Sequence, residues 1–293
     1  MSDAIYFKQF EVGPMQNYVY LIGDPETREA AVVDAAWEID AIVEAAEADG
    51  YRITTDLVTH FHPDHLGGAL MGHQITGAAE LVARVPAKVV IHKAELPYVH
   101  RLTGLSSSDI TPVEGGTDVP VGKLTVKMLH TPGHTPGSCS FLREADRTLI
   151  AGDCVLKRIT PNPVLSPDPL DPSRRFPSLA EYLVSLARLR AFSPTLVYGG
   201  HGDVIRDYEE LFHRYFRAFQ ERQTQVIGLV KKSGVTAWDV GQGMFPGADD
   251  VHRFLAVSEA VAHLDLAHSE GKIGVELAGH TEVYKPKDPT SRI

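Results

Sequence analysis

Six consecutive residues, His60-Phe61-His62-Pro63-Asp64-His65, place three imidazoles and one carboxylate in one short segment. They follow residues 56–59, which we predict to be a strand. Imidazole and carboxylate together suit zinc and its divalent neighbours, and packing rarely needs so many of them at such short range. His60 and His62 are two residues apart, so on an extended backbone their side chains point the same way. This hexapeptide, residues 60–65, predicts a metal site at a strand end and can supply ligands to two ions.

A solvated histidine-rich loop is the alternative interpretation, because the chain contains 14 histidines and some will cluster by chance. A low-complexity histidine tract would lack the strand in front of the hexapeptide. It would also lack the start of a helix behind it, which we predict at Leu66-Gly67-Gly68-Ala69. The spacing of the ligands therefore favours a metal site.

Bulk composition narrows the class of protein. The chain has 293 residues and a formal charge of −10, which argues against nonspecific affinity for nucleic acid or anionic membranes. Its two cysteines, Cys139 and Cys154, fit no metal-ligand spacing and predict a reducing compartment without disulfides. The first residues show no signal-peptide pattern, and no stretch of about 18 apolar residues occurs. We therefore expect a cytoplasmic protein with no membrane partner.

The predicted elements fall into two domains, residues 1–206 and 207–293. In the first domain we expect strands at 5–12, 17–22, 30–34, 56–59, 88–91, 124–129, 138–142, 148–151 and 195–198, and helices at 39–48, 66–79 and 178–191. Six prolines make residues 161–177 a stiff surface loop. The second domain is predicted to contain helices at 208–232 and 249–269, a short element at 236–243 and a hairpin at 272–286. This order is typical of a winged helix.

Three further candidate ligands lie on later strand ends. His134 sits between glycines and prolines in a loop, where the backbone can hold a fixed turn that projects one side chain. Asp153 directly follows an apolar strand, and its two oxygens can bridge two cations. His201 follows another strand and is flanked by glycines. A lone histidine of this kind is more often structural, but the shared placement of all three after strands favours a site with two metals.

With these residues the chain resembles the metallo-β-lactamase-fold hydrolase superfamily. The resemblance spans residues 5–205, and its motif segments occur in the family order: Asp34, the hexapeptide, His134, Asp153 and His201. It implies an α/β fold, an αββα sandwich with the metal site at one edge, followed here by a small helical, winged-helix-like domain. Asp153 stands where the common antibiotic-hydrolysing lactamases carry cysteine, so a β-lactam substrate is disfavoured. The glyoxalase II, lactonase, ribonuclease and thioesterase branches are more similar, and the tail resembles the branch of β-lactamase-like protein 2.

The resemblance also implies a role for each ligand. His60, His62 and His134 would bind the first metal, whereas Asp64, His65 and His201 would bind the second. Asp153 would bridge the two ions, and Asp34 would support a ligand without being one. Zinc is the expected ion, with iron or manganese as alternatives.

The function expected from this site is hydrolysis of an ester, thioester, lactone or phosphodiester bond in a small-molecule substrate. A hydroxide shared by the two metals would be the nucleophile, and the catalytic Asp64 would also carry a proton to the leaving group. Phe61 could form an apolar wall beside the substrate, and Lys157 and Arg158 could hold an anionic group. For these three residues, ordinary packing and solvation are equally good interpretations. A homo-oligomer is compatible with the sequence.

Two other functions compete with this one. The same fold supports mononuclear iron dioxygenases that act on persulfides, although the full set of second-metal ligands argues against this. A ribonuclease or nucleic-acid-binding protein could instead use the C-terminal domain. That domain has 10 basic and 13 acidic residues, a balance of −3, whereas a winged helix that reads DNA is normally basic.

Overall fold

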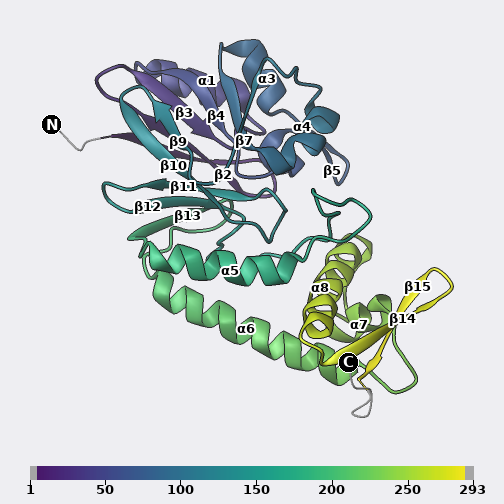
Figure 1. Cartoon of the computed structure of the whole chain (residues 1–293). Coiled ribbons are helices and arrows are strands. Elements are labelled where there is room, and N and C mark those ends of the chain that lie inside the picture. Colours follow the sequence, from purple (N-terminus) through teal and green to yellow (C-terminus); the bar gives the residue numbers. More distant parts are fainter. Residues whose placement is uncertain (1–4, 288–293) are drawn as a thin grey trace. The chain divides into compact units, whose positions relative to one another are not determined.

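The computed structural model describes residues 5–287, and by their contacts these residues divide into two compact units (Figure 1). The first unit contains the residues up to Pro132, together with Pro136–Pro161 and Ser185–Tyr208. The second contains Gly133–Thr135, Asn162–Val184 and the residues from Glu209 onward. The last of these breaks is close to the predicted boundary at residues 206 and 207. The second unit also includes two segments that precede that boundary.

The first sheet of the first unit has six strands in the order β1-β2-β3-β4-β7-β8. The β1–β2 and β2–β3 pairs are antiparallel, whereas β3–β4, β4–β7 and β7–β8 are parallel. Residues at the carboxyl ends of parallel strands meet at one sheet edge, and the hexapeptide follows β4 at this edge. The strands are β1 (Tyr6–Val12), β2 (Asn17–Gly23), β3 (Glu29–Val33), β4 (Arg52–Leu57), β7 (Lys88–His92) and β8 (Ile110–Val113).

The second sheet has five strands in the order β13-β12-β11-β10-β9. Its pairs are antiparallel except for β12 and β13, which run parallel. The strands are β9 (Asp118–Val121), β10 (Leu124–His130), β11 (Cys139–Arg143), β12 (Thr148–Gly152) and β13 (Leu196–Gly199). His134 follows β10, Asp153 follows β12 and His201 follows β13, as predicted from the sequence.

The two sheets pack face to face, and helices cover them. Successive side chains of a strand point to opposite faces. Tyr20 of β2 therefore packs in one cluster with Phe141 of the second sheet, while Leu21 packs with Ile42 of α1 in another. The part of α5 that belongs to this unit, from Ser185 onward, lies along the second sheet (Figure 1). The helices are α1 (Ile39–Ala48), α3 (Ala78–Arg84) and α5 (Ser178–Ala191). The predicted mixed α/β fold is confirmed.

The helix predicted over residues 66–79 is wrong. The chain instead forms a single turn, α2 (Pro63–Leu66), and a small hairpin of β5 (Gly68–Leu70) and β6 (His73–Ile75), before α3 begins at Ala78. Gly67 and Gly68 have φ values of 98° and 126°, and the turn of the hairpin also has positive φ at residues 71 and 72. Left-handed backbone of this kind ends a right-handed helix. Two glycines in succession therefore outweigh the helical propensity of the alanines around them.

Four elements between β7 and β10 were not predicted from the sequence: a 3₁₀ turn, α4, β8 and β9. One further segment was misjudged. A short 3₁₀ turn, Lys93–Glu95, leads into α4 (Leu96–Thr103), where Pro97 occupies an early helical position that tolerates proline. The proline-rich segment 161–177 lacks helices and strands as predicted, apart from an isolated bridge between Pro167 and Arg175. Several of its residues, including Val164 and Ser166, are nevertheless buried, so it is only partly a surface loop.

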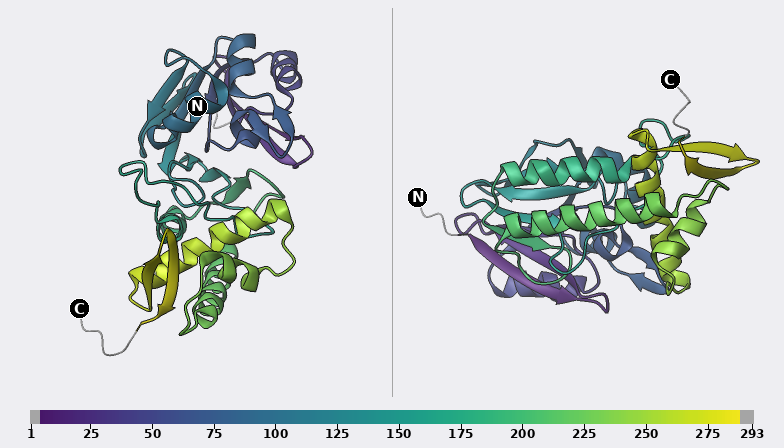
Figure 2. Two further views of the ribbon diagram at one scale, coloured as in Figure 1. Left: turned by 90° about the vertical axis from the view of Figure 1, so that its right-hand side faces the viewer. Right: turned by 90° about the horizontal axis from the view of Figure 1, so that it is seen from below.

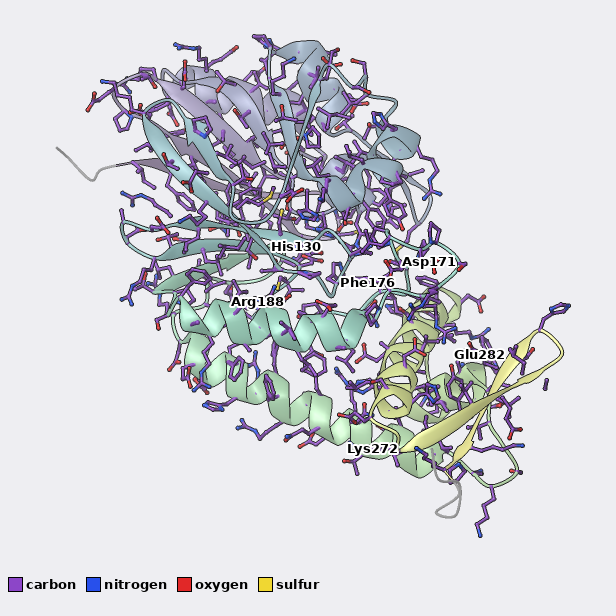
Figure 3. The ribbon with its side chains drawn as sticks, in the orientation of Figure 1. His130, Asp171, Phe176, Arg188, Lys272 and Glu282 are labelled. Atoms are coloured by element: carbon purple, nitrogen blue, oxygen red, sulfur yellow. The ribbon has the colours of Figure 1, made fainter. Side chains whose placement is uncertain are left out.

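The second unit contains α6 (Tyr208–Leu229) from Glu209 onward, α7 (Ala237–Met244), α8 (Asp250–Ser269) and a hairpin of β14 (Ile273–Ala278) and β15 (Thr281–Pro286), seen from two sides in Figure 2. A small core joins these elements and includes Val226, Leu264 and Tyr284. Arg175 of the proline-rich segment donates two hydrogen bonds to Asp265 of α8 and lies 2.9 Å from Glu282 of the hairpin, labelled in Figure 3. Within residues 5–287 no helix is long and apolar enough to cross a membrane.

Two stacked histidines join the sheets of the first unit at their edge. His92 ends β7, His130 (labelled in Figure 3) ends β10, and their rings are parallel with centroids 3.9 Å apart. Burial, the neighbouring His130 and Lys93 lower the pKa of His92 to about 4, although Glu114 opposes this shift. The folded protein therefore keeps His92 neutral at a pH where the unfolded chain protonates it.

We predict that His92 makes unfolding pH-dependent. Between about pH 6.5 and pH 4 the unfolded state binds more protons at this residue, so its contribution to the free energy of unfolding falls as the pH falls, by at most about 1.4 kcal/mol per pH unit. His92→Phe retains a ring but does not titrate. Urea denaturation of the metal-free wild type and variant at pH 7.5, 6 and 5 should give a stability difference that shrinks toward low pH. A difference independent of pH would contradict the assignment.

Candidate metal centre

After β4 ends at Leu57, the chain has no regular structure until α2 begins at Pro63. Val58 still donates to Val90 of β7, and Pro63 begins α2, where the missing N–H of proline needs no partner. His60, His65 and Asp64 are buried with exposed fractions of 1%, 1% and 5%, so the segment points its ligands inward. A buried cluster of this kind is costly unless the groups pair with each other or with a cation.

Ring nitrogens of His60, His62 and His134 lie within 4.8 Å of one another, and we call these residues the three-histidine group. The Nδ1 atom of His60 is 3.0 Å from the Thr59 hydroxyl, and the Nδ1 atom of His134 is 2.8 Å from the carbonyl oxygen of Asn162. The remaining His60 nitrogen, Nε2, is 3.1 Å from His62 Nδ1. Two nitrogens that bind one zinc ion tetrahedrally lie about 3.3 Å apart, so this pair fits a shared ion.

Asp64, His65 and His201 offer a second set of ligand atoms within 4.8 Å of one another, which we call the Asp64 group. His65 Nδ1 is 3.0 Å from Asp34 Oδ2, and His201 Nδ1 is 3.1 Å from the carbonyl oxygen of Met15. Acceptors at Nδ1 fix the tautomer that presents Nε2 for metal binding. Both Nε2 atoms are 3.4 Å from the same oxygen, Asp64 Oδ2.

Asp153 lies beside the Asp64 group. One of its oxygens is 3.6 Å from His65 Nε2, and the other is 3.6 Å from His201 Nε2. Gly200 makes room for it, because a Cβ atom there would lie 2.3 Å from Asp153 Oδ1 and 2.6 Å from the His65 ring. The glycine before His201 is thus required by close approach.

The charges of the Asp64 group are those of a cation site. Burial lowers the pKa of His65, but the carboxylates of Asp64 and Asp153 outweigh it, and the pKa is raised well above its usual value. Burial likewise opposes the shift at His201, where Asp153 and Asp64 raise the pKa. The pKa of Asp64 is lowered well below its usual value, because His65 and His201 outweigh the effect of burial. Positive charge is therefore favoured at the position that a divalent ion would take.

Asp34 lies where the sequence placed it, at the end of β3. It accepts hydrogen bonds from both the backbone and the hydroxyl of Thr59, each at 2.7 Å, in addition to its contact with His65. Its oxygens are therefore engaged, although Asp34, His60 and His65 also lie within 4.8 Å of one another. This arrangement suits a residue that orients a ligand better than it suits a ligand.

The three residues suggested for substrate contact lie in two different settings. The Phe61 ring stacks on Tyr98 at 4.0 Å and packs against an apolar cluster of the first unit. Lys157 and Arg158 are exposed and form ion pairs with Asp203 at 3.5 and 3.2 Å. An anionic substrate would have to compete with Asp203 for these two cations.

Two buried polar residues at the site were not found from the sequence, Asn17 and Glu95. The Glu95 side chain is fully buried and accepts hydrogen bonds from Phe61 N at 2.9 Å and Gly137 N at 2.5 Å. It therefore ties the hexapeptide to the loop that carries His134. Its place shortly after the strand 88–92 was the only available signal, and the sequence did not say which loops it would reach.

The sequence matches the profile of a known protein family. The profile described as Metallo-beta-lactamase superfamily covers residues 12–201. The chain belongs to this superfamily. It is 30% identical over 158 residues to the probable metallo-hydrolase YqjP of Bacillus subtilis, covering 54% of this chain and 49% of that protein. It is 33% identical over 187 residues to a hydroxyacylglutathione hydrolase of Methylococcus capsulatus, covering 63% and 62%.

Two further relatives cover more of the chain. A beta-lactamase-like protein 2 homolog of Caenorhabditis elegans is 25% identical over 75% of this chain and 66% of its own length. A crystal structure of a metallo-beta-lactamase family protein from Thermus thermophilus aligns with a TM-score of 0.75 at 23% identity, over 97% of this chain and 98% of that one. The predicted membership of the superfamily is confirmed. The predicted similarity to the glyoxalase II branch and to the branch of β-lactamase-like protein 2 is also confirmed. The chain spans about half the length of curated relatives such as YqjP and a hydroxyacylglutathione hydrolase of Bradyrhizobium.

We predict that Glu95→Ala destabilises the protein without removing a ligand. The change leaves the backbone N–H groups of Phe61 and Gly137 without their acceptor, at about 1–3 kcal/mol each, so the free energy of unfolding should fall by about 2–6 kcal/mol. Urea denaturation of the metal-free protein measures this. Glu114→Ala is the control, because Glu114 is exposed and its carboxylate pairs with Lys93 at the surface. Its effect should stay within about 0.5 kcal/mol, and equal losses in both variants would contradict the role of Glu95.

Proposed function

We propose that this protein is a hydrolase that uses two divalent metal ions. The observation that carries the proposal is the pair of ligand groups described above, in which four of the five histidines have one ring nitrogen against an oxygen acceptor or hydroxyl. In this proposal the three-histidine group would hold one ion and the Asp64 group the other, and Asp153 would be a ligand to both. Zinc suits this mixture of nitrogen and oxygen donors, with iron or manganese as alternatives.

Two ions held in this way would supply Lewis acidity and would lower the pKa of a bound water molecule toward neutral pH. The chain's own residues orient the candidate metal ligands. Asp34 and the carbonyl oxygens of Met15 and Asn162 hold the imidazoles in one tautomer. Asp64 directs Oδ2 toward His65 and His201, and its other oxygen can take a proton and pass it to the leaving group.

A thioester is the substrate class that we propose. Several relatives are named hydroxyacylglutathione hydrolase, and an acylated glutathione is a thioester. Asp153 in place of a cysteine disfavours β-lactam hydrolysis, in keeping with the resemblance. Ester, lactone and phosphodiester bonds remain predictions, because the same pair of ions would activate water against each of them.

We further propose that the helices α6, α7 and α8 with the β14–β15 hairpin form a winged-helix-like domain from residue 207 onward. The order of the elements supports this, while the net charge of −3 disfavours binding to nucleic acid. A ribonuclease activity would need a local basic patch in this domain. A cytoplasmic location and a homo-oligomer remain predictions.

Metal analysis with a substrate panel tests the proposal. We expect two ions per chain and hydrolysis of a thioester in preference to a lactone, a β-lactam, a phosphodiester and short RNA. Asp64→Asn keeps the size of the side chain but loses its charge, and kcat should fall by about 100-fold or more. His252→Ala, a change at an exposed histidine of α8, is the control and should have little effect. A single bound iron with oxygen consumption would instead support a persulfide dioxygenase.

A further inference from the structure

Asn17 lies at the first position of β2 and is buried, with 1% of its surface exposed. Its side-chain nitrogen is 3.0 Å from Asp64 Oδ2 and 3.1 Å from the Asp64 carbonyl oxygen. The same nitrogen is 3.4 Å from His65 Nε2 and 3.5 Å from His201 Nε2. Asn17 therefore touches every member of the Asp64 group, although it belongs to a different strand.

The orientation of the Asn17 amide follows from its other neighbour. The indole nitrogen of Trp37 is 3.1 Å from Asn17 Oδ1. An indole nitrogen only donates, so the atom that faces it must be the amide oxygen, and the NH₂ group must face Asp64. Trp37 is itself fixed, because its backbone nitrogen donates to Thr76 and its carbonyl oxygen accepts from the Thr76 hydroxyl.

The number of donors decides what Asn17 can do. An amide NH₂ has two hydrogens, and two oxygens of Asp64 lie at normal hydrogen-bond distance, whereas the histidine nitrogens are further away. An NH₂ group has no lone pair available for a metal. Asn17 is thus suited to neither ligation nor substrate binding, and both its donors hold the backbone and side chain of one residue.

We propose that Asn17, locked by Trp37, is a positioning residue for the second metal. It keeps Asp64 Oδ2 turned toward the ring nitrogens of His65 and His201. The backbone around Asn17 fixes the other side of the group, because Tyr18 N donates to Gly200 O and Met15 O faces His201 Nδ1. The inference rests on the proposed two-metal site, but it concerns metal affinity and not the reaction.

Cobalt titration of the metal-free protein tests this role. Wild type should take up Co²⁺ in two steps, and the step that His201→Ala removes is assigned to the Asp64 group. Asn17→Ala should weaken that step by about 10–100-fold and leave the other within threefold, because partners that orient a ligand have effects of this size. Trp37→Phe should weaken the same step less, while Trp238→Phe, at an exposed tryptophan of α7, should change neither.

A merely structural role for Asn17 predicts a different result. Both steps would then weaken equally, or the apo protein would lose stability while both affinities stayed within threefold of wild type, and either outcome would overturn the proposal. A single step in wild type would refute the two-metal function without deciding the role of Asn17. Hydrogen exchange of the Asn17 side-chain amide in the apo protein tests the Asn17–Asp64 contact independently of the two-metal function. The Asn17 NH₂ signals should be protected and lose protection in Asp64→Ala, whereas fast exchange in wild type would refute the Asn17–Asp64 contact.

Discussion

The rest of the site depends on the hydrogen bonds that the Asp34 carboxylate accepts. This carboxylate receives the backbone and hydroxyl of Thr59 immediately before the hexapeptide and the ring of His65 at its end. The Thr59 hydroxyl also faces His60 Nδ1. One buried side chain at the end of β3 thus holds both ends of the hexapeptide, whose first three residues have no regular structure. Asp34 itself has a φ of 56°, an uncommon conformation for a residue other than glycine.

Around this anchor, carbonyl oxygens from other parts of the chain face His134 and His201, and Glu95 accepts from the backbone of the hexapeptide. Met15 lies before β2, Asn162 in the proline-rich segment, and Glu95 after β7. The carboxylates in turn favour positive charge on His65 and His201, so the protein concentrates negative potential where a divalent ion would bind. Rigid orientation and charge complementarity act together, and this is what a pre-organised metal site requires.

Much of the fold was readable from local patterns. Most strands of both sheets, the helix 178–191 and the hairpin after α8 match their predicted segments to within a few residues. The error at 66–79 arose because alanines suggested a helix while adjacent glycines adopt positive φ, a conformation that only the folded backbone reveals. The buried part of the proline-rich segment was misjudged for a similar reason. Proline excludes regular structure but does not decide whether a segment is exposed.

The sequence by itself determined the types of the candidate ligands and their places after strands, because spacing within the hexapeptide and chain order are local properties. It also indicated Asp34 through the resemblance. Only the tertiary structure decided that Asn17, Trp37 and Glu95 belong to the site. Asn17 and Asp64 are 47 positions apart, and Glu95 and Gly137 are 42 apart. Single polar residues of this kind carry no periodic or motif signal. Their roles follow from buried donors and acceptors that must find partners once the sheets have packed.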